Sequence, residues 1–201
     1  MEEGFTLWLT GLSGSGKTTI AEMMERELRS RGMKVERLDG EEIRAHLKET
    51  LGFTRRDREI HLRYLAFICG LLNRNGIVAV VGAISPYRDL REMVRNLLYK
   101  YIEIYCQCPL DVLQVRDTKG GYRRAVSGKI DYFTVISDPY EEPEQPEVIL
   151  RTHLETPGES VGNLLKFLEN SGLVPVPPSP PGDYSEEEEQ IIAERLKNFG
   201  Y

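Results

Sequence analysis

The sequence contains few of the residues that build disulfide frameworks or zinc sites. Its 201 residues include three cysteines, at positions 69, 106 and 108, and only three histidines. Neither a C-x-x-C pair nor a second pair of cysteines is present, so the spacing fits neither a disulfide scaffold nor a structural zinc site. The sequence therefore predicts three buried, reduced thiols.

Long apolar segments are also missing. No apolar run approaches the roughly 18 residues that cross a bilayer. The acidic start, Met1-Glu2-Glu3-Gly4, lacks the basic, apolar and small-residue regions of a signal peptide. We therefore expect a cytoplasmic protein that does not bind membranes. The chain length and the hydrophobic content of 40% suit one α/β domain with a tail.

An excess of positive charge is missing as well. The formal net charge is −6, and residues 183–201 carry six acidic and only two basic side chains. The rest of the chain is therefore close to neutral and lacks the basic footprint that nucleic-acid binding requires. Anionic ligands must instead be bound by local basic clusters.

Strand-like and helix-like segments alternate along most of the chain. The run at 77–84, IVAVVGAI, is almost entirely apolar, which is typical of a central parallel strand with helices on both faces. The alternation predicts a doubly wound parallel α/β sheet whose ligands bind beyond the carboxyl ends of the strands. Residues 119–140 show no clear period and are predicted to form a mobile loop. The expected strands are 5–10, 34–38, 77–84, 101–106 and 148–151, and the expected helices are 17–31, 41–49, 57–75, 90–99, 110–116 and 159–171.

The stretch GLSGSGKT at residues 11–18 directly follows the first predicted strand. It matches the P-loop pattern G-x-x-x-x-G-K-[ST] between a strand and a helix. Its glycines let backbone N–H groups point at phosphate, and the helix dipole favours the anion. Lys17 would reach the β- and γ-phosphates of ATP, and the Thr18 hydroxyl would bind Mg²⁺. The predicted ATP-binding residues of this motif are Gly11, Ser13, Gly14, Ser15, Gly16, Lys17, Thr18 and Thr19.

A charged cluster, DGEEIR at residues 39–44, follows the strand predicted at 34–38. Carboxylates at this place can orient Mg²⁺ or accept a proton from an attacking hydroxyl. Arg44 lies one turn after Glu41 and is suited to hold an anionic substrate. On spacing alone, a solvated helix N-terminus explains these residues equally well. The functional interpretation assigns catalysis to Lys17, Asp39 and Glu41, and the metal to Thr18, Asp39 and Glu41.

Six stretches carry a family resemblance: WLTGLSGSGKTTIA, LDGEEIR, LGFTRRDR, ISPYR, RDTKGGY and FTVISDPYEEPEQPE. In order and spacing, from about residue 5 to residue 168, they resemble the adenylylsulfate kinase (APS kinase) family of P-loop kinases. Many nucleotide-binding proteins share the P-loop, whereas the stretches that follow it are far more specific for this family. The resemblance implies transfer of the ATP γ-phosphate to the ribose 3′-hydroxyl of adenosine 5′-phosphosulfate, which yields 3′-phosphoadenosine 5′-phosphosulfate.

The resemblance also implies roles for residues outside the P-loop. Arg44 and Arg58 match arginines that bind the acceptor, and Phe53 and Phe133 match two aromatics that sandwich its adenine. As bare residues, both phenylalanines would instead be expected in a core. Residues 119–124 match a basic lid over the nucleotides. The implied acceptor-binding set is Arg44, Phe53, Arg58, His61, Ile84, Ser85, Pro86, Lys129 and Phe133, while Arg116 and Lys119 complete the ATP site.

Three positions depart from the family pattern. The family usually reads Asp-Gly-Asp-Asn where this chain has Glu41 and Glu42, and it has Asn where His61 stands. These departures favour a first alternative, a kinase of the same architecture that acts on a different small anionic nucleotide or sugar phosphate. A second alternative is a nucleotide-binding regulatory partner of ATP sulfurylase. The intact Lys17 and Thr18 argue against a protein without catalysis.

The composition changes after residue 173. Residues 174–184 are rich in proline and predict a semi-rigid linker. In residues 185–201, Ser185 is placed to cap an acidic amphipathic helix. The predicted organisation is thus a P-loop kinase domain at 1–173, this linker, and a helix that docks on a partner such as ATP sulfurylase or folds back. Small nucleotides are the expected ligands, and the family resemblance favours a homodimer.

Overall fold

The computed structural model of the chain describes residues 3–47, 51–117, 120–126, 134 and 138–176. Its strands form one parallel sheet in the order β2-β3-β1-β4-β5. The β1 strand, which leads into the P-loop, is therefore central. This order confirms the predicted doubly wound sheet. The strands are β1 (Thr6–Thr10), β2 (Val35–Asp39), β3 (Val78–Gly82), β4 (Tyr101–Gln107) and β5 (Val148–Arg151).

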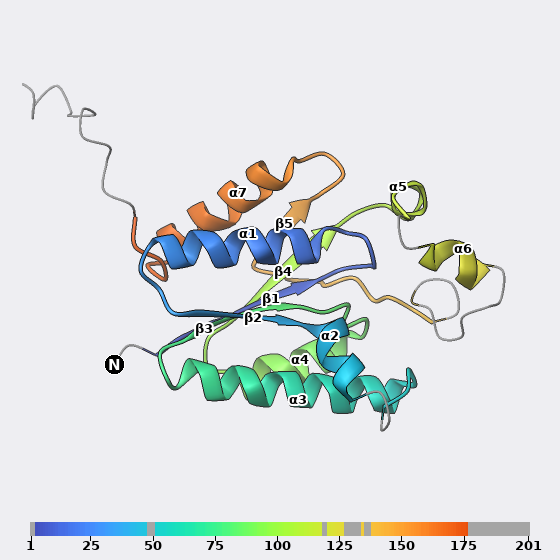
Figure 1. Cartoon of the computed structure of the whole chain (residues 1–201), viewed down its shortest axis with the longest axis horizontal. Coiled ribbons are helices and arrows are strands. Elements are labelled where there is room, and N and C mark those ends of the chain that lie inside the picture. Colours follow the sequence, from blue (N-terminus) through green and yellow to red (C-terminus); the bar gives the residue numbers. More distant parts are fainter. Residues whose placement is uncertain (1–2, 48–50, 118–119, 127–133, 135–137, 177–201) are drawn as a thin grey trace, which may run out of the picture.

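Helices cover both faces of the sheet (Figure 1). The α1 and α7 helices lie on one face, and α3 and α4 lie on the other. The α2, α5 and α6 helices lie at the edge where the strands have their carboxyl ends. This edge is where ligands of such sheets bind. The helices are α1 (Lys17–Ser30), α2 (Gly40–His46), α3 (Arg55–Asn73), α4 (Arg88–Leu97), α5 (Leu110–Val115), α6 (Gly121–Val126) and α7 (Pro157–Asn170).

Two apolar clusters fill the spaces between the sheet and the helices. Leu7 and Leu9 of β1 belong to the cluster under α1 and α7, whereas Trp8 belongs to the cluster with α3 and α4 residues. All three side chains are fully buried. Because successive side chains of a strand point to opposite faces, β1 can bury all of them only if both faces are covered.

The prediction of a mobile loop at 119–140 is wrong where α6 lies. Tyr122 and Ala125, three residues apart in this helix, are both buried. The Tyr122 hydroxyl donates to the Ser13 carbonyl at 2.8 Å, so α6 is attached to the P-loop. A helix of six residues is too short to give a recognisable periodic pattern, which explains why the sequence did not indicate it.

Capping boxes start two helices earlier than the apolar pattern predicted. Thr54 and Asp57 cap each other's backbone, so α3 begins at residue 55 instead of 57. Thr156 and Glu159 do the same for α7, which begins at residue 157 instead of 159. In each box two N–H groups that lack a helical partner are satisfied. The strand predicted at 77–84 likewise ends at Gly82, two residues early.

The three cysteines are buried and free, as predicted. Burial raises the pKa of the Cys69 and Cys106 thiols to about 12, so both remain protonated. Protonated thiols are poor nucleophiles and poor metal ligands.

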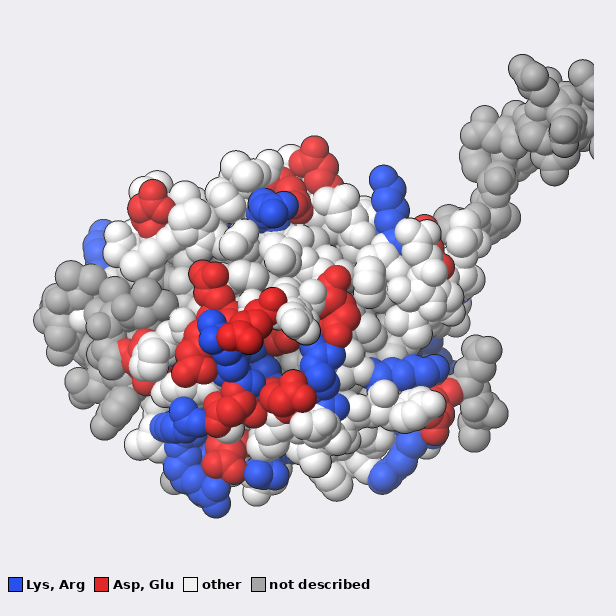
Figure 2. Space-filling model, turned by 180° about the vertical axis from the view of Figure 1, so that it is seen from behind, with Lys and Arg blue, Asp and Glu red and all other residues white. Residues whose placement is uncertain are grey.

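No helix within the described ranges combines the length and the apolar character needed to cross a bilayer. Acidic and basic side chains lie intermingled on the face of the molecule that Figure 2 shows.

The predicted linker is described only at residues 174–176. Val174 packs into the cluster under α1 and α7, and Arg31 donates to the Pro175 carbonyl at 3.1 Å. Residues 177–184 and the helix predicted at 185–201 lie outside the described residues, so the predicted division of the chain remains a prediction there.

Candidate active site

The P-loop connects β1 to α1 at the centre of the sheet edge. Gly11, Gly14 and Gly16 have φ values of 147°, 79° and 90°. A side-chain carbon on Gly11 would lie 2.6 Å from the Cys106 carbonyl oxygen, so only glycine fits beside β4. No side chain caps the start of α1 at Gly16. The first N–H groups of α1 are therefore left without a capping side chain, as an anion-binding helix start requires.

The Lys17 ammonium is turned back onto the P-loop. Its Nζ donates to the carbonyl oxygens of Gly11 at 3.0 Å and Leu12 at 2.7 Å. Ser13 is half-buried, Ser15 is buried, and Thr18 and Thr19 are exposed at the start of α1. The motif thus places one cation and a set of backbone N–H groups at the carboxyl end of β1.

Thr18 and Asp39 join the P-loop to the end of β2. Thr18 Oγ1 donates to Asp39 Oδ2 at 3.5 Å, while Asp39 Oδ1 accepts from the backbone N–H groups of Glu41 at 2.8 Å and Glu42 at 3.2 Å. The Asp39 carboxylate is therefore fixed as the N-cap of α2 and still presents one oxygen to Thr18. Glu41 is exposed in the first turn of α2.

This pair of oxygen donors fits Mg²⁺. Hydroxyl and carboxylate oxygens are the hard ligands that Mg²⁺ prefers, and the ion usually takes only one or two protein ligands beside substrate phosphates. The described residues contain no group of three or more His, Cys, Asp and Glu side chains arranged to hold a metal. An ion at Thr18 and Asp39 would therefore depend on the nucleotide for most of its ligands.

Arg44 on α2 is held from three sides at the edge where the strands have their carboxyl ends. Its Nη1 donates to the Gly52 carbonyl at 2.6 Å, and its Nη2 lies 3.0 Å from His61 Nδ1. Its guanidinium carbon lies 5.2 Å from the ring centre of Phe53. Phe53 is 51% exposed, so the expectation that it belongs to a core is wrong. A half-buried cation and an exposed aromatic ring thus lie side by side.

His61 on α3 is a buried neutral acceptor for Arg44. A guanidinium can only donate, so Nδ1 must offer a lone pair and Nε2 must carry the proton. The pKa of His61 is lowered to about 4, chiefly by burial and also by the nearby cations Arg44 and Arg58, while a hydrogen bond with the Gly40 backbone acts in the opposite direction. At neutral pH the ring therefore carries no charge.

Stability below neutral pH should depend on His61. Between pH 6.5 and about 4, the unfolded chain binds a proton at this ring and the folded chain does not. The free energy of unfolding should therefore decrease as the pH falls. The contribution of His61 is fully present above pH 6.5, and about 2 kcal/mol of it is lost at pH 5. Urea denaturation at pH 5 and 7.5 should show a smaller difference for His61→Gln than for the wild type. His46→Gln, at an exposed histidine, is the control, and equal differences in all three proteins would contradict the assignment.

Arg58 on α3 contacts the same loop as Arg44 and has protein partners. Its Nε donates to the Phe53 carbonyl at 3.1 Å, and its Nη2 lies 3.0 Å from Asp138 Oδ2. The Tyr87 hydroxyl donates to the other oxygen of Asp138 at 2.7 Å. Arg58 thus connects the loop that carries Phe53 to the segment around Asp138.

The turn after β3 contains the predicted acceptor-facing residues Ile84, Ser85 and Pro86. Ile84 is half-buried, and Ser85 and Pro86 are buried. Ser85 has a φ of 40°, an uncommon value for a residue with a side chain. Its hydroxyl contacts Trp8 and Thr10 at 3.1 Å each. The turn itself borders the edge, but the Ser85 hydroxyl is bound inside the protein.

Arg116 lies at the end of α5, close to the P-loop. Its two terminal nitrogens each donate to the Thr152 carbonyl at 3.2 Å. A side-chain carbon on Gly16 would lie 3.8 Å from Thr152 Cγ2, which places Arg116 on the P-loop flank of the edge. The other residues predicted in this region, Lys119, Lys129 and Phe133, lie outside the described residues.

The adenylylsulphate kinase family matches residues 3–151 of the sequence. The chain belongs to this family. The adenylyl-sulfate kinase of Halothermothrix orenii is 46% identical over 88% of this chain and 95% of its own. A probable bifunctional SAT/APS kinase of Sorangium cellulosum is 45% identical over 86% of this chain and 30% of its own. The solved APS kinase of Mycobacterium tuberculosis in complex with AMPPNP and APS has a TM-score of 0.79 at 35% identity, covering 84% of this chain and 99% of that one.

Within this adenylylsulphate kinase architecture, four residues that border the site were not among those predicted from the sequence. They are Thr10, Tyr122, Asp138 and Tyr140, and three of them lie in the stretch predicted as a loop. Thr10 gave a detectable signal, because a hydroxyl at the end of a buried apolar strand needs a partner. The remaining three become apparent only when the chain is folded.

Proposed function

We propose that the protein transfers the γ-phosphate of ATP to the ribose 3′-hydroxyl of adenosine 5′-phosphosulfate. The observation that carries this proposal is the contact between Thr18 and Asp39, which joins the P-loop to α2. This contact places a phosphate-binding loop beside a helix that bears a carboxylate, Glu41, and a cation, Arg44. Family membership and the M. tuberculosis relative in complex with an ATP analogue and APS support the same reaction.

On the donor side, the P-loop N–H groups and Lys17 bind the β- and γ-phosphates of ATP. Lys17 can leave its carbonyl partners for phosphate oxygens, because charge-assisted hydrogen bonds to an anion are stronger than bonds to neutral carbonyls. Thr18 and Asp39 would hold Mg²⁺, which when bound would supply positive charge beside the phosphates. Arg116, at the end of α5, binds the donor together with Lys119.

On the acceptor side, Arg44 binds the phosphosulfate anion and Phe53 stacks on the adenine, with Phe133 on its other face. Phe53 is exposed enough for stacking, and Arg44 presents a cation beside it. Arg58, His61 and Lys129 complete this side, together with the turn at 84–86. Glu41 accepts the proton of the 3′-hydroxyl, for which its exposed carboxylate at the helix start is suited.

No covalent intermediate is needed for this transfer. The α2 helix carries both Glu41 and Arg44, so the group that binds the acceptor anion and the group that takes its proton are held by one rigid element. Holding two reactants in line lowers the barrier by removing entropy loss from the reaction step. Electrostatic stabilisation by Lys17 and the metal supplies the rest.

Steady-state assays with a panel of acceptors test the proposed function. The purified protein, ATP and Mg²⁺ are combined with adenosine 5′-phosphosulfate, adenosine 5′-phosphate or a sugar phosphate, and ADP release is measured. We expect kcat/KM for the phosphosulfate to exceed that for adenosine 5′-phosphate by at least about 10²-fold, because a desolvated arginine site discriminates strongly against a missing partner group. Turnover of another acceptor without turnover of the phosphosulfate would reject the proposal. It would favour the alternative that Glu41, Glu42 and His61 suggest.

The homodimer and the ATP sulfurylase partner also remain proposals. Four large apolar side chains, Tyr64, Phe67, Leu97 and Tyr99, are each at least half exposed on α3 and at the end of α4. The last three line a hollow of about 520 Å³. Clustered apolar exposure of this kind supports a contact surface. A sedimentation mass of 23.0 kDa, that of one chain, would contradict the dimer.

The bifunctional name of the S. cellulosum relative supports the sulfurylase partner. A pull-down with this protein that does not recover ATP sulfurylase would count against that partner.

A further inference from the structure

We propose that Thr10 is a positioning residue for phosphoryl transfer. Its hydroxyl ties the strand that carries the P-loop to the two segments that border the acceptor. Thr10 is the last residue of β1 and directly precedes Gly11, and it is fully buried. This inference rests on the proposed function, because it concerns the distance between donor and acceptor in that reaction.

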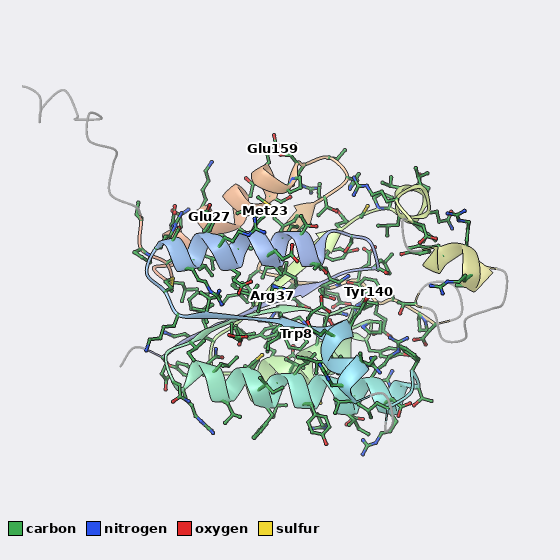
Figure 3. All side chains as sticks on the ribbon, viewed as in Figure 1. Trp8, Met23, Glu27, Arg37, Tyr140 and Glu159 are labelled. Carbon is green, nitrogen blue, oxygen red and sulfur yellow. The ribbon has the colours of Figure 1, made fainter. Side chains whose placement is uncertain are left out.

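Three buried or half-buried groups converge on the Thr10 hydroxyl. Thr10 Oγ1 lies 2.7 Å from the Ile84 carbonyl, 3.1 Å from Ser85 Oγ and 3.1 Å from the Tyr140 hydroxyl. Ile84 and Ser85 belong to the turn after β3. Tyr140 lies on the segment that also contains Asp138, the partner of Arg58. Figure 3 labels Trp8 below the sheet and Tyr140 near the carboxyl ends of its strands.

The direction of each hydrogen bond follows from counting protons. The Ile84 carbonyl can only accept, so the single Thr10 proton is donated to it. Thr10 must then accept from both other hydroxyls, Ser85 and Tyr140. Ser85 Oγ is in turn available to accept from Trp8 Nε1, whose distance to it is 3.1 Å. The network has one consistent direction, and every lone pair of Thr10 is used.

This network holds a backbone conformation that is costly without support. Ser85 has a φ of 40°. A residue with a side chain keeps such a backbone conformation only where the surrounding contacts hold it. Arg91 supports the same turn from the other side, with Nη1 2.7 Å from the Ser85 carbonyl and Nη2 2.7 Å from the Glu141 carbonyl. The Thr10 hydroxyl is the member of this set that belongs to the P-loop strand. It therefore relates the acceptor turn to the phosphate site.

Thr10→Val tests the inference, because valine has the same shape and lacks the hydroxyl. With Thr10 unable to hold the turn, we expect kcat to fall about 10²-fold, which is the cost of a misplacement near 1 Å. The KM for the acceptor should rise several-fold, and the KM for ATP should stay within about twofold, since the P-loop backbone makes its own contacts. Thr10→Ser keeps the hydroxyl and should restore most of the activity.

Thr6→Val is the matched control. Thr6 starts the same strand, is also fully buried, and donates to Asn73 Oδ1 at 2.8 Å, far from the P-loop end. Both valine variants lose one buried hydrogen bond, so both should lose stability, but Thr6→Val should keep both KM values and kcat. If Thr10→Val has the kinetic constants of Thr6→Val, or raises the KM for ATP as much as that for the acceptor, the inference is overturned.

Tyr140→Phe decides the matter if Thr10→Val does not fold. It removes one hydroxyl and keeps the stacking of the ring on Tyr105, with centroids 6.2 Å apart. We expect a smaller effect of the same kind as in Thr10→Val, with a raised KM for the acceptor and an unchanged KM for ATP. If neither KM changes, the inference is overturned. All variants are compared with whichever acceptor the wild type phosphorylates. The proposed function can therefore fail with the wild type while the role of Thr10 is still tested.

Discussion

Replacing Lys17 with methionine should lower kcat by about 10³-fold and leave the protein folded, because the ammonium that binds the β- and γ-phosphates also stabilises the charge that develops on the transferred phosphate. In the structure, Lys17 starts α1 and its Nζ contacts two carbonyl oxygens of the P-loop. Methionine keeps the length of the side chain and removes the charge. The change therefore separates electrostatic stabilisation from the shape of the loop.

Coupled assays of ADP release and thermal unfolding measure the two effects of this variant separately. Lys34→Met, at an exposed lysine before β2, is the control and should retain full activity. A melting temperature within about 2 °C of the wild type would show that the loss is chemical, since 1 kcal/mol shifts a chain of this size by about 2–4 °C. Unchanged phosphoryl transfer by Lys17→Met would mean that a contaminant, and not this protein, produced the wild-type signal.

Replacing Glu103 with leucine should lower the free energy of unfolding by about 3 to 5 kcal/mol, because it leaves a buried guanidinium without its carboxylate. Glu103 on β4 is 7% exposed and Arg91 on α4 is 3% exposed. Arg91 Nε lies 2.7 Å from Glu103 Oε1, and Arg95 Nη2 lies 3.3 Å from Glu103 Oε2. Leucine cannot compensate for Arg91, whereas Arg95 keeps Glu147 as a partner at 2.5 Å.

Chemical denaturation measures this loss, and Glu92→Gln is its matched control. The Glu92 side chain is 62% exposed and lies 3.8 Å from Arg95, so its removal should cost less than about 1 kcal/mol. Activity should also fall in Glu103→Leu, because Arg91 holds the Ser85 carbonyl. Equal, small losses in the two variants would show that Arg91 does not need its buried partner.

Features set by local sequence were predictable, and contacts set by strand pairing were not. The P-loop is encoded in eight consecutive residues, and β1 was recognisable as the apolar run that directly precedes it. The contact of Thr10 with Ser85 joins positions 75 residues apart, which become neighbours only because β1 pairs with β3. No local period carries that information.

The surroundings of Arg44 illustrate the same limit. Arg44 was predicted to bind an anion because of its residue type and its position on the helix. Its contacts with Gly52 and His61 depend on how α2 packs on α3 and could not be read from spacing. Phe53 was expected in a core on the basis of residue type, yet it is exposed beside Arg44. The short α6 helix escaped detection because six residues hold less than two helical turns.

A crystal structure of the protein with a non-hydrolysable ATP analogue, Mg²⁺ and adenosine 5′-phosphosulfate tests the central claim most directly. The account predicts triphosphate on the P-loop at Lys17, the phosphosulfate at Arg44, and the ribose 3′-oxygen beside Glu41, in line with the terminal phosphate. An acceptor whose 3′-oxygen pointed away from the triphosphate, or one bound elsewhere than on the α2 flank, would contradict it.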